Sequence, residues 1–489
     1  MTIRESTVTT VEGATPPSTP PPSRGRHERV FDVWIPLAVM ATFPFVLLLQ
    51  GPLQISDPDS FWHIRAGHYV LETWRLSGPE PWSAASSHPW VLHEWLTEVL
   101  MAAADSASGL AGVTTLWALG MLLVFVALFM ASRHQGTVLQ ALIGAMAGWF
   151  GAWAGLGPRP QLVTFALLAV TTGAWLRSSR DLKPRWWLVP MTWLWACAHG
   201  MWFIGPIVGL AVTVGLLLDG RDRRAVLRLA IVPVLSVLIA AVTPVGPQLL
   251  LAPFAVSDYT KYVTEWAPAG LTSPTFAATL AMLLLTLMMW LRRGERVPWS
   301  HVALWLVALG WMLLYARTIA VGAVIAAPLL VGALHATFGG PPPVRLSARR
   351  GETMLLLGSV AVALVAVATM SAGTSSRPDH VPSGLNPQLD ALAPRTVVFN
   401  EYSLGGWLLW RHPDLLPVID GRTEIFSVAY VDHYMVALSA QPGWQATLDR
   451  SGARVALVPD DSALGDALVH GRGWTVAGAD DGYLLLQAP

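Results

Sequence analysis

The chain has 489 residues, of which 53% are hydrophobic and 13% are charged, and its formal net charge is zero. A soluble globular domain carries roughly 25% charged residues, so this composition excludes an ordinary soluble enzyme and indicates a membrane protein. The zero net charge argues against a nucleic-acid partner. The single cysteine, Cys197, lies inside an apolar run and cannot form an intramolecular disulfide.

Residues 1–32 are rich in Thr, Ser and Pro, which predicts a disordered cytoplasmic tail rather than a cleavable signal. Apolar windows long enough to cross a hydrocarbon core of about 30 Å then recur along the chain. They show no strand-like alternation, so we predict an α-helical polytopic membrane protein. The transmembrane domain is expected over 33–371, with about eleven spans at 33–50, 108–131, 138–155, 161–176, 186–199, 202–218, 229–243, 275–291, 300–316, 318–336 and 353–371.

The distribution of positive charge predicts the orientation. With the N-terminus in the cytoplasm, the cytoplasmic segments carry 19 Arg and Lys residues and the outer loops between spans carry five, as the positive-inside rule requires. We therefore predict a protein of the cytoplasmic (inner) membrane whose first outer loop covers 51–106. Residues 372–387 are typical of a linker, and 388–489 alternate short apolar runs with helical stretches, which predicts a small extracytoplasmic α/β domain.

The first outer loop carries a dense group of chemically active side chains. Asp57, Asp59, His63 and Arg65 follow one another directly after the first span. Two carboxylates beside imidazole and guanidinium groups supply a general base or a cation ligand next to an anion binder. Arginine suits phosphate because its planar donors engage two oxygens at once. The alternative is that these charges only solvate a surface loop. The segments "FWHIRAGHYVLETW" and "WVLHEWLTEVLMAA" each have one apolar face and are expected to be interfacial helices.

Other outer positions fall on the same face of the membrane. They are Arg159 in "GLGPRPQ", His199 in "ACAHGMW", Glu265 in "YVTEWAP" and Arg317 in "LYARTIA". An unpaired Arg159 at a membrane boundary would be costly, so a partner or ligand is expected there. A structural role for His199 and snorkelling of Arg317 to the interface are the alternatives.

The combination of these motifs resembles a known group of proteins. "DPDSFWHIRAG", "HPWVLHEWL", "RPQ", "HG", "TPVG", "TEWAP" and "YARTIA", together with "FNEYSLGGWLLW" and "PVIDGRTEIF" in the tail, resemble bacterial polytopic membrane proteins that are similar to GT-C glycosyltransferases. That superfamily includes the protein O-mannosyltransferases and the catalytic subunit of oligosaccharyltransferase. The resemblance covers nearly the whole chain after the tail.

The resemblance implies a sugar donor linked to polyprenyl phosphate and an acidic residue in the first outer loop that serves as base or metal ligand. That residue is Asp57, with Asp59 beside it, and a divalent cation such as Mg²⁺ or Mn²⁺ would bind there if one is used. The tail lacks the tryptophan-rich motif of oligosaccharyltransferase, so recognition of a peptide sequon is not expected. The expected substrate-binding residues are His63, Arg65, His93, Glu94, Arg159, His199, Glu265, Arg317, Asn400, Glu401, Asp420 and Arg422. For the last four, a role in the turns of "GG" and "DGR" is an equally open interpretation.

The predicted function is therefore a membrane glycosyltransferase that acts on a glycan, lipid or protein of the cell envelope. A transporter or flippase for a lipid-linked or small polar substrate is the first alternative, and a noncatalytic scaffold is the second. The spans are almost free of charge and the polar groups collect at one face, which favours surface chemistry over transport.

Overall fold

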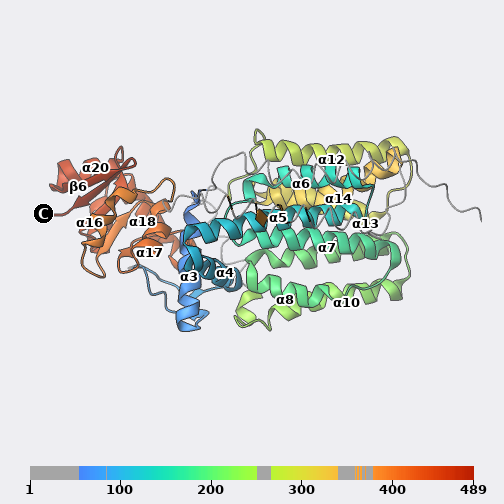
Figure 1. The fold of residues 1–489 in the computed structure, drawn as a ribbon, viewed down its shortest axis with the longest axis horizontal. Helices are drawn as coiled ribbons and strands as arrows, with labels where there is room; N and C mark the ends of the chain where they lie inside the picture. The colour runs from blue at the N-terminus through green and yellow to red at the C-terminus, as the bar shows by residue number, and fades with distance from the viewer. Residues whose placement is uncertain are drawn as a thin grey trace, which may run out of the picture.

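The computed structural model describes residues 54–83, 85–250, 266–339 and 378–489, together with scattered positions between 358 and 369. The predicted tail 1–32, the first span 33–50, most of the last span 353–371 and Glu265 lie outside the described residues. The described chain forms a helical bundle, two helices at one end of that bundle, and a C-terminal part that contains a β-sheet (Figure 1).

The bundle is made of apolar helices, and every predicted span between residues 108 and 336 falls on one of them. Among the described residues, five segments are long and apolar enough to cross a membrane: Leu110–Arg133, Gln161–Asp181, Gly200–Leu218, Pro274–Arg293 and Ala316–Phe338. The chain is therefore a multi-pass membrane protein. The bundle helices are α5 (Leu110–Arg133), α6 (Val138–Gly151), α7 (Gln161–Asp181), α8 (Leu188–Ala198), α9 (Ile204–Leu218), α10 (Arg223–Ala240), α12 (Pro274–Arg293), α13 (Trp299–Leu314) and α14 (Ile319–Phe338).

Helix α14 is the most enclosed of the long helices together with α7, with 78% of its most apolar window buried. Small residues allow α6 to approach it closely. A Cβ atom added at Gly144 would lie 2.2 Å from Val331 Cγ2, and one added at Gly148 would lie 2.7 Å from Ala327 Cβ. Glycines spaced four apart on one helix face are a common means of bringing two membrane helices together.

Two helices of the segment predicted to be the first outer loop, 51–106, lie at one end of the bundle; the name first outer loop is kept for this segment below. Helix α3 (Pro58–Thr73) runs across the bundle axis, and α4 (Trp95–Ser108) packs against it and leads into α5 (Figure 1). The first predicted segment is helical, whereas in the second the helix begins only at Trp95, because Trp90 and Val91 belong to a short strand. A short antiparallel pair, β1 (Ser77–Gly78) and β2 (Trp90–Val91), joins the two ends of the intervening loop. These elements form the surface on which the C-terminal part rests.

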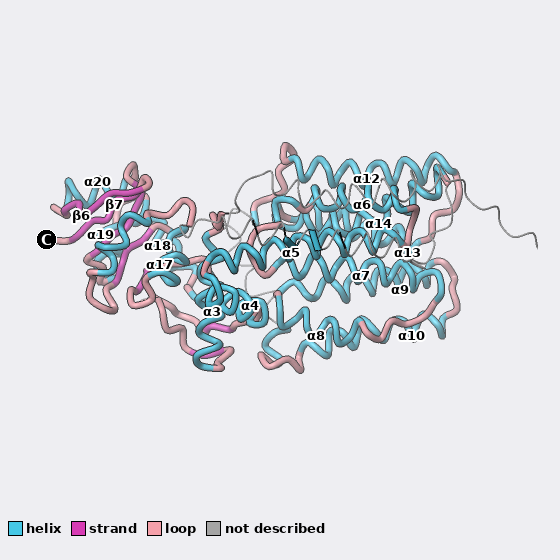
Figure 2. Tube along the Cα trace, viewed as in Figure 1, coloured by secondary structure: helices cyan, strands magenta, loops and turns pink. Residues whose placement is uncertain are grey.

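The C-terminal residues form a five-stranded mixed sheet, in which the order of the strands is β4-β3-β5-β7-β6 (Figure 2). Strand β3 (Val397–Asn400) runs parallel to both β4 (Leu416–Pro417) and β5 (Val455–Pro459), whereas β7 (Tyr483–Gln487) is antiparallel to β5 and to β6 (Thr475–Asp480). The helices of this part are α16 (Asn386–Asp390), α17 (Gly405–Arg411), α18 (Val428–Leu438), α19 (Trp444–Ser451) and α20 (Ala463–Asp466).

The C-terminal part and α3 share one hydrophobic core. Phe61 and Ile64 of α3 are buried in the same cluster as Trp407 and Leu408 of α17. Phe61 also packs against the Trp410 ring, with 5.5 Å between the ring centroids. Burial of this apolar surface holds the sheet against the end of the membrane bundle.

Candidate functional site

Two carboxylates meet one guanidinium at the start of α3. Asp57 caps this helix, because its Oδ1 accepts a hydrogen bond from the Asp59 backbone N–H at 3.1 Å. Asp57 Oδ2 pairs with Arg159 Nε, and Asp59 Oδ2 lies 3.1 Å from Arg159 Nη1. Residues that are 102 positions apart in the sequence therefore form one ion-paired group.

The loop that carries Arg159 is held directly against α3. The Ser60 hydroxyl donates a hydrogen bond to the Pro158 carbonyl oxygen at 2.9 Å. Pro160 then ends the loop, and α7 begins at Gln161. This connection fixes the arginine beside the helix N-terminus, where the helix dipole also favours the two carboxylates.

The group of Asp57, Asp59 and Arg159 is partly buried, and its surroundings shift the pKa of Asp59. The side chains of Arg159, Asp57 and Asp59 are 12%, 16% and 26% exposed, so none of them faces bulk solvent. Burial raises the pKa of Asp59, and the nearby charge of Asp57 raises it further, whereas Arg159 opposes both effects; the net shift is upward. A carboxylate with a raised pKa is a better proton acceptor near neutral pH than an ordinary aspartate.

Arg317, in the short helical turn between α13 and α14, contributes positive charge to the same group. Its charge acts with that of Arg159 against the upward shift of the Asp59 pKa. The guanidinium lies over the Trp266 ring at 5.6 Å from the centroid. It also lines a cavity of about 110 Å³ together with Gln161 at the start of α7 and Thr275 on α12. The predicted neighbour Glu265 lies outside the described residues.

The C-terminal part covers Asp59 through two glycines. A Cβ atom added at Gly421 would lie 2.1 Å from Asp59 Oδ1 and 2.7 Å from Trp62 Nε1. One added at Gly406 would lie 2.4 Å from the Pro58 carbonyl oxygen. Helix α17 at Gly406 and the turn at Gly421 therefore approach α3 at a distance that only glycine permits. Trp62 Nε1 donates a hydrogen bond to Asp59 Oδ1 at 3.0 Å, which orients the carboxylate.

Gly421→Ala is expected to disrupt this contact, because the added methyl group overlaps the Asp59 carboxylate. We expect the C-terminal part to become more sensitive to limited proteolysis and the activity of the protein to fall. Gly471→Ala is the matched control, since a Cβ atom there has no heavy atom within 4 Å. Equal protease resistance and activity in the two variants would contradict the tight packing of Gly421 on α3.

Asp420 and Arg422, from the "DGR" turn, form a buried ion-paired group with Glu80 of the first outer loop. Arg422 Nε and Nη2 donate to the two Asp420 carboxylate oxygens at 2.8 and 2.7 Å, and Arg422 Nη1 lies 2.9 Å from Glu80 Oε1. None of these three side chains has exposed surface. The guanidinium also lies 4.8 and 4.6 Å from the ring centroids of Trp82 and Trp90. This group links the C-terminal part to the first outer loop.

Asn400 and Glu401 are engaged in bonds within the C-terminal part. Asn400 Nδ2 donates to the Ile419 carbonyl oxygen at 2.9 Å, and its Oδ1 accepts from the Val418 N–H at 3.0 Å. The side chain therefore joins the end of β3 to the two residues that follow β4. The Glu401 carboxylate accepts a hydrogen bond from the Ser403 N–H at 2.8 Å and so caps a short helix. The described contacts of both side chains are with their own domain.

A second polar cluster lies between α3 and the start of α4 and is centred on Glu94. Glu94 Oε1 is 3.4 Å from His199 Nε2 and 3.5 Å from His93 Nε2, and it accepts a hydrogen bond from the Gly200 N–H at 3.2 Å. His63 Nδ1 is 3.0 Å from Glu98 Oε1, and His63 Nε2 is 3.9 Å from Glu94 Oε2. The structure thus brings His63, His93, Glu94 and His199 together.

The hydrogen-bond partners of His199 determine its tautomer. Its Nδ1 accepts from the Met201 N–H at 3.3 Å, and the Thr164 hydroxyl lies 2.7 Å from the same atom. Thr164 Oγ1 already accepts from Trp195 Nε1 at 2.7 Å, so its own proton points to the histidine. His199 therefore carries its proton on Nε2, where it faces Glu94.

Burial and neighbouring charges shift the pKa values of the cluster's side chains in different directions. Burial lowers the pKa of His63 to about 3, so this imidazole is neutral at pH 7. Burial opposes protonation of His93 too, but its hydrogen bond to Glu94 and the Glu94 charge outweigh burial and raise its pKa to about 9. Burial, followed by the charge of Glu94, raises the pKa of Glu98 well above its usual value. His93 and Glu94 therefore form the charged pair of the cluster.

The raised pKa of His93 predicts a loss of stability at alkaline pH. Its ordinary value is 6.5 and its folded value is about 9, so the folded state binds more protons between these values. The stabilisation is fully present below about pH 6.5 and disappears as the pH rises through about 9. The melting temperature of the wild type should fall over this range more steeply than that of His93→Gln. Parallel pH profiles for the two proteins would contradict the His93–Glu94 assignment.

Arg65 lies apart from the two carboxylates. Its described contacts are Glu72, at 3.8 Å, and the Trp82 ring, at 5.3 Å from the centroid. Within the described part of the chain, no group of three or more His, Cys, Asp or Glu residues has the arrangement needed to hold a metal ion. The electropositive partner of Asp57 and Asp59 in the structure is Arg159.

Four residues of these groups were not among the predicted site residues: Glu80, Glu98, Trp62 and Tyr402. Burial raises the pKa of Tyr402, and the charge of Asp59 raises it further. Trp62 and Tyr402 lie inside the motifs "DPDSFWHIRAG" and "FNEYSLGGWLLW", and their place in these motifs could have indicated a role in the site. Nothing in the local pattern around Glu80 indicates that it is buried against Arg422.

Comparison with known proteins identifies the fold. No protein-family model matches the sequence, and no curated protein matches it. The oligosaccharyltransferase AglB from Archaeoglobus fulgidus, solved with an inhibitory peptide and a dolichol-phosphate, matches with a TM-score of 0.62 and 12% identity over 89% of this chain and 70% of that chain. The same enzyme tethered to an acceptor peptide matches with a TM-score of 0.61 and 12% identity, over 88% and 70%.

ArnT from Cupriavidus metallidurans, bound to undecaprenyl phosphate, matches with a TM-score of 0.46 and 16% identity over 94% of this chain and 98% of that chain. AglB is a GT-C glycosyltransferase, and the fold assignment depends on its match alone. Over 89% of its length, the chain thus shares the fold of AglB. The predicted similarity to the GT-C fold is confirmed.

Proposed function

We propose that this protein is a membrane glycosyltransferase that moves a sugar from a polyprenyl-phosphate-linked donor to an acceptor of the cell envelope. The observation that carries the proposal is the contact of Arg159 with both Asp57 and Asp59 at the covered end of the bundle. It combines a proton acceptor with a phosphate-binding group beside Arg317 and its cavity. The AglB fold supports the same class of reaction, since that enzyme was solved with a dolichol-phosphate.

The chemistry needs one carboxylate and at least one arginine. The acceptor hydroxyl transfers its proton to the carboxylate, and its oxygen forms a bond to the anomeric carbon of the sugar. The bond from that carbon to the phosphate oxygen breaks, and the electron pair leaves with the phosphate. The sequence favoured Asp57 as the base; we propose its neighbour Asp59 as the stronger candidate, because it lies in the same ion-paired group and burial raises its pKa. Arg159 and Arg317 would stabilise the charge of the departing phosphate.

Arg159 also gives a reason for ordered binding. Its guanidinium is engaged by both aspartates. A lipid phosphate competes for the same donors, and its arrival would release a carboxylate for the acceptor proton. Binding of the donor would therefore prepare the base, which limits loss of the sugar to water.

A divalent cation such as Mg²⁺ or Mn²⁺ would find its carboxylate ligands in Asp57 and Asp59. Both are already bound by Arg159, and the described residues around them supply no third His, Asp, Glu or Cys ligand. The arrangement therefore fits an arginine-centred site better than a metal-centred one, and no step above depends on a metal ion.

The proposal includes the orientation in the membrane. We place the N-terminus in the cytoplasm, eleven spans in the inner membrane, and residues 388–489 on the outer face as an α/β domain joined by the linker 372–387. Asp57, Asp59, Arg159 and Arg317 would then act at the outer surface, where a lipid-linked donor meets its glycan, lipid or protein acceptor.

The direct test uses the purified full-length protein in lipid nanodiscs. A panel of radiolabelled polyprenyl-phosphate hexoses and pentoses is supplied together with envelope fractions from cells that lack the protein. We expect transfer of label to the acceptor fraction and release of polyprenyl phosphate for one member of the panel. Movement of the labelled lipid across a liposome bilayer without a glycosylated product would instead favour the transporter interpretation.

A further inference from the structure

A basic cavity lies at the end of the bundle opposite to Asp57. Helix α7 starts two residues after Arg159 and ends at Asp181, so its length of about 30 Å separates the two ends. The cavity has a volume of about 330 Å³ and lies between the last turns of α7, α12 and α14 and the start of α13. That volume falls in the range of small-molecule sites. Nothing that binds there can touch the proposed reaction centre.

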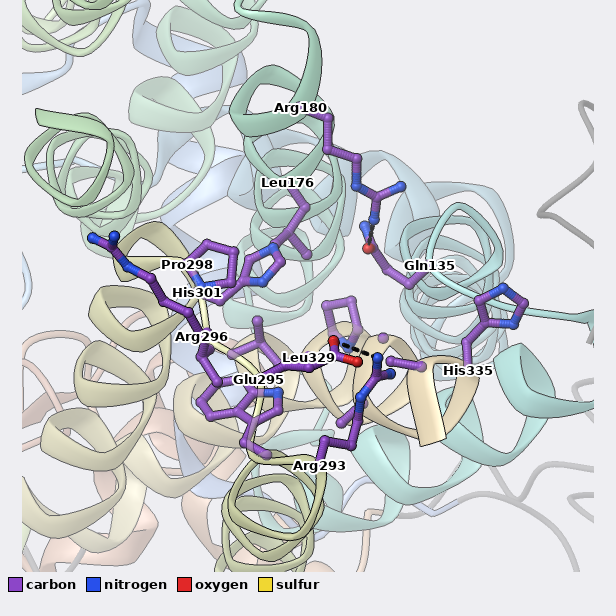
Figure 3. Close-up of a pocket in the computed structure, with 16 residues that line it drawn as sticks. Gln135, Leu176, Arg180, Arg293, Glu295, Arg296, Pro298, His301, Leu329 and His335 are labelled. Carbon is purple, nitrogen blue, oxygen red and sulfur yellow. Dashed lines mark hydrogen bonds and ion pairs between the residues drawn. The ribbon is translucent and has the colours of Figure 1, made fainter. Parts of the chain in front are cut away.

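The polar lining of this cavity is strongly positive. Figure 3 shows the side chains that surround it: Gln135, Arg180, Arg293, Arg296, His301 and His335. Glu295 is the one carboxylate among the lining residues, and it pairs with Arg293 Nη2 at 2.6 Å from a position that is 70% exposed. The lining therefore holds three guanidinium groups but only one carboxylate, which faces solvent and pairs with Arg293 alone. Such an excess of positive charge attracts an anion.

Gln135 supplies an independent sign of a ligand. Its side chain is 4% exposed, and its Oε1 accepts a hydrogen bond from Arg180 Nη2. Its Nε2 is buried and has no hydrogen-bond partner among the described residues. A buried donor without an acceptor costs roughly 1–3 kcal/mol, so polar groups of this kind are usually satisfied by something. An anion in the cavity would provide the acceptor.

The remaining walls are apolar. Trp290, Leu176, Leu329 and Ala333 line the cavity below the charged groups. A site with an apolar wall and a basic rim between membrane helices suits a phosphate group, either of an anionic lipid headgroup or free in solution. Arginine is the preferred partner because it can give two parallel hydrogen bonds to phosphate.

We propose that this cavity is a second anion site, which binds a phosphate group through Arg180, Arg293 and the Gln135 amide. The site is separate from the proposed reaction centre and does not depend on the transferase activity. Its position at the far end of the bundle allows a phosphate-bearing molecule to stabilise the packing of α7, α12 and α14 without occupying the donor site.

The test measures binding by isothermal titration calorimetry on the full-length protein in neutral detergent. Inorganic phosphate and dihexanoyl phosphatidic acid are titrated separately, with dihexanoyl phosphatidylcholine as the zwitterionic comparison. All proteins carry Arg317→Ala, which weakens phosphate binding at the reaction centre, and the contribution of Arg159 there is the same in every variant, so differences between variants report the second site. In that background we compare Arg180→Ala, Gln135→Glu and, as matched control, Arg224→Ala, an exposed arginine of α10 that does not line the cavity.

Arg180→Ala is expected to weaken phosphate or phosphatidic acid binding about tenfold, which corresponds to the loss of one charge-assisted contact. Gln135→Glu should weaken it at least as much, since the new carboxylate repels the anion and pairs with Arg180, which preserves the fold. Arg224→Ala should bind normally. Binding of phosphatidic acid alone identifies a lipid headgroup, and binding of both ligands shows that phosphate suffices. Equal affinities in all variants, or no binding of either ligand, would overturn the proposal.

Discussion

Asp59→Asn is expected to lower the rate of sugar transfer by at least about 10²-fold, which is the usual contribution of a general base. Asparagine keeps the oxygen that accepts the Trp62 hydrogen bond, so the fold should persist. The measurement is transfer of labelled sugar at saturating donor, with the melting temperature recorded alongside. In the wild type, activity should fall on the acid side at a pH above the ordinary aspartate pKa of 3.8, because the Asp59 pKa is raised.

The matched control is Glu72→Gln, which removes a carboxylate from the same helix at a position that is 59% exposed. It should retain full activity. Arg159→Lys should be inactive or nearly so, because a lysine cannot contact Asp57 and Asp59 through two separate nitrogen atoms. If Asp57→Asn and Asp59→Asn were both fully active, this group would not be the reaction centre.

Arg422→Met is expected to destabilise the contact between the C-terminal part and the first outer loop by about 3–5 kcal/mol. The variant leaves the Asp420 and Glu80 carboxylates buried without their cation, and it removes the stacking of the guanidinium on Trp82 and Trp90. Differential scanning fluorimetry should report a melting temperature lower by roughly 10 °C. Limited proteolysis should cleave the C-terminal part earlier than in the wild type.

Arg472→Met serves as the comparison, because that arginine belongs to the same domain but forms an exposed ion pair with Asp449. Its effect should stay within about 1 kcal/mol. Adding Asp420→Asn and Glu80→Gln to Arg422→Met should recover part of the loss, because neutral amides are less costly to bury than unpaired carboxylates. No recovery would mean that the aromatic stacking rather than the charge accounts for the effect.

Composition and hydropathy predicted the helical bundle well. The spans between residues 108 and 336 were found because a membrane helix needs about 20 consecutive apolar residues, a requirement visible in any single stretch of sequence. The boundaries differ by a few residues where a polar end continues the helix. Helix α7 runs to Asp181 rather than 176, since Arg177 and Arg180 extend beyond the apolar window.

The candidate site was predicted as a set of residues on one face, and the structure divides it into separate groups. Asp57, Asp59 and Arg159 form one group, His63, His93, Glu94 and His199 form a second, and Asp420 and Arg422 form a third with Glu80. Topology alone assigns a residue to a membrane face, but it does not assign the partner of each side chain across that face. Glu80 shows this clearly, because its neighbours in sequence do not indicate burial.

By itself, the sequence determined that this protein spans a membrane as a helical bundle and which candidate site residues fall on one face of it, since apolar length and charge are local properties. Only the tertiary structure decided that Arg159 joins both aspartates, that Gly421 presses on Asp59, and that a second basic cavity opens at the far end. Those contacts depend on side chains separated by tens to hundreds of residues, and packing rather than local pattern selects which of them meet.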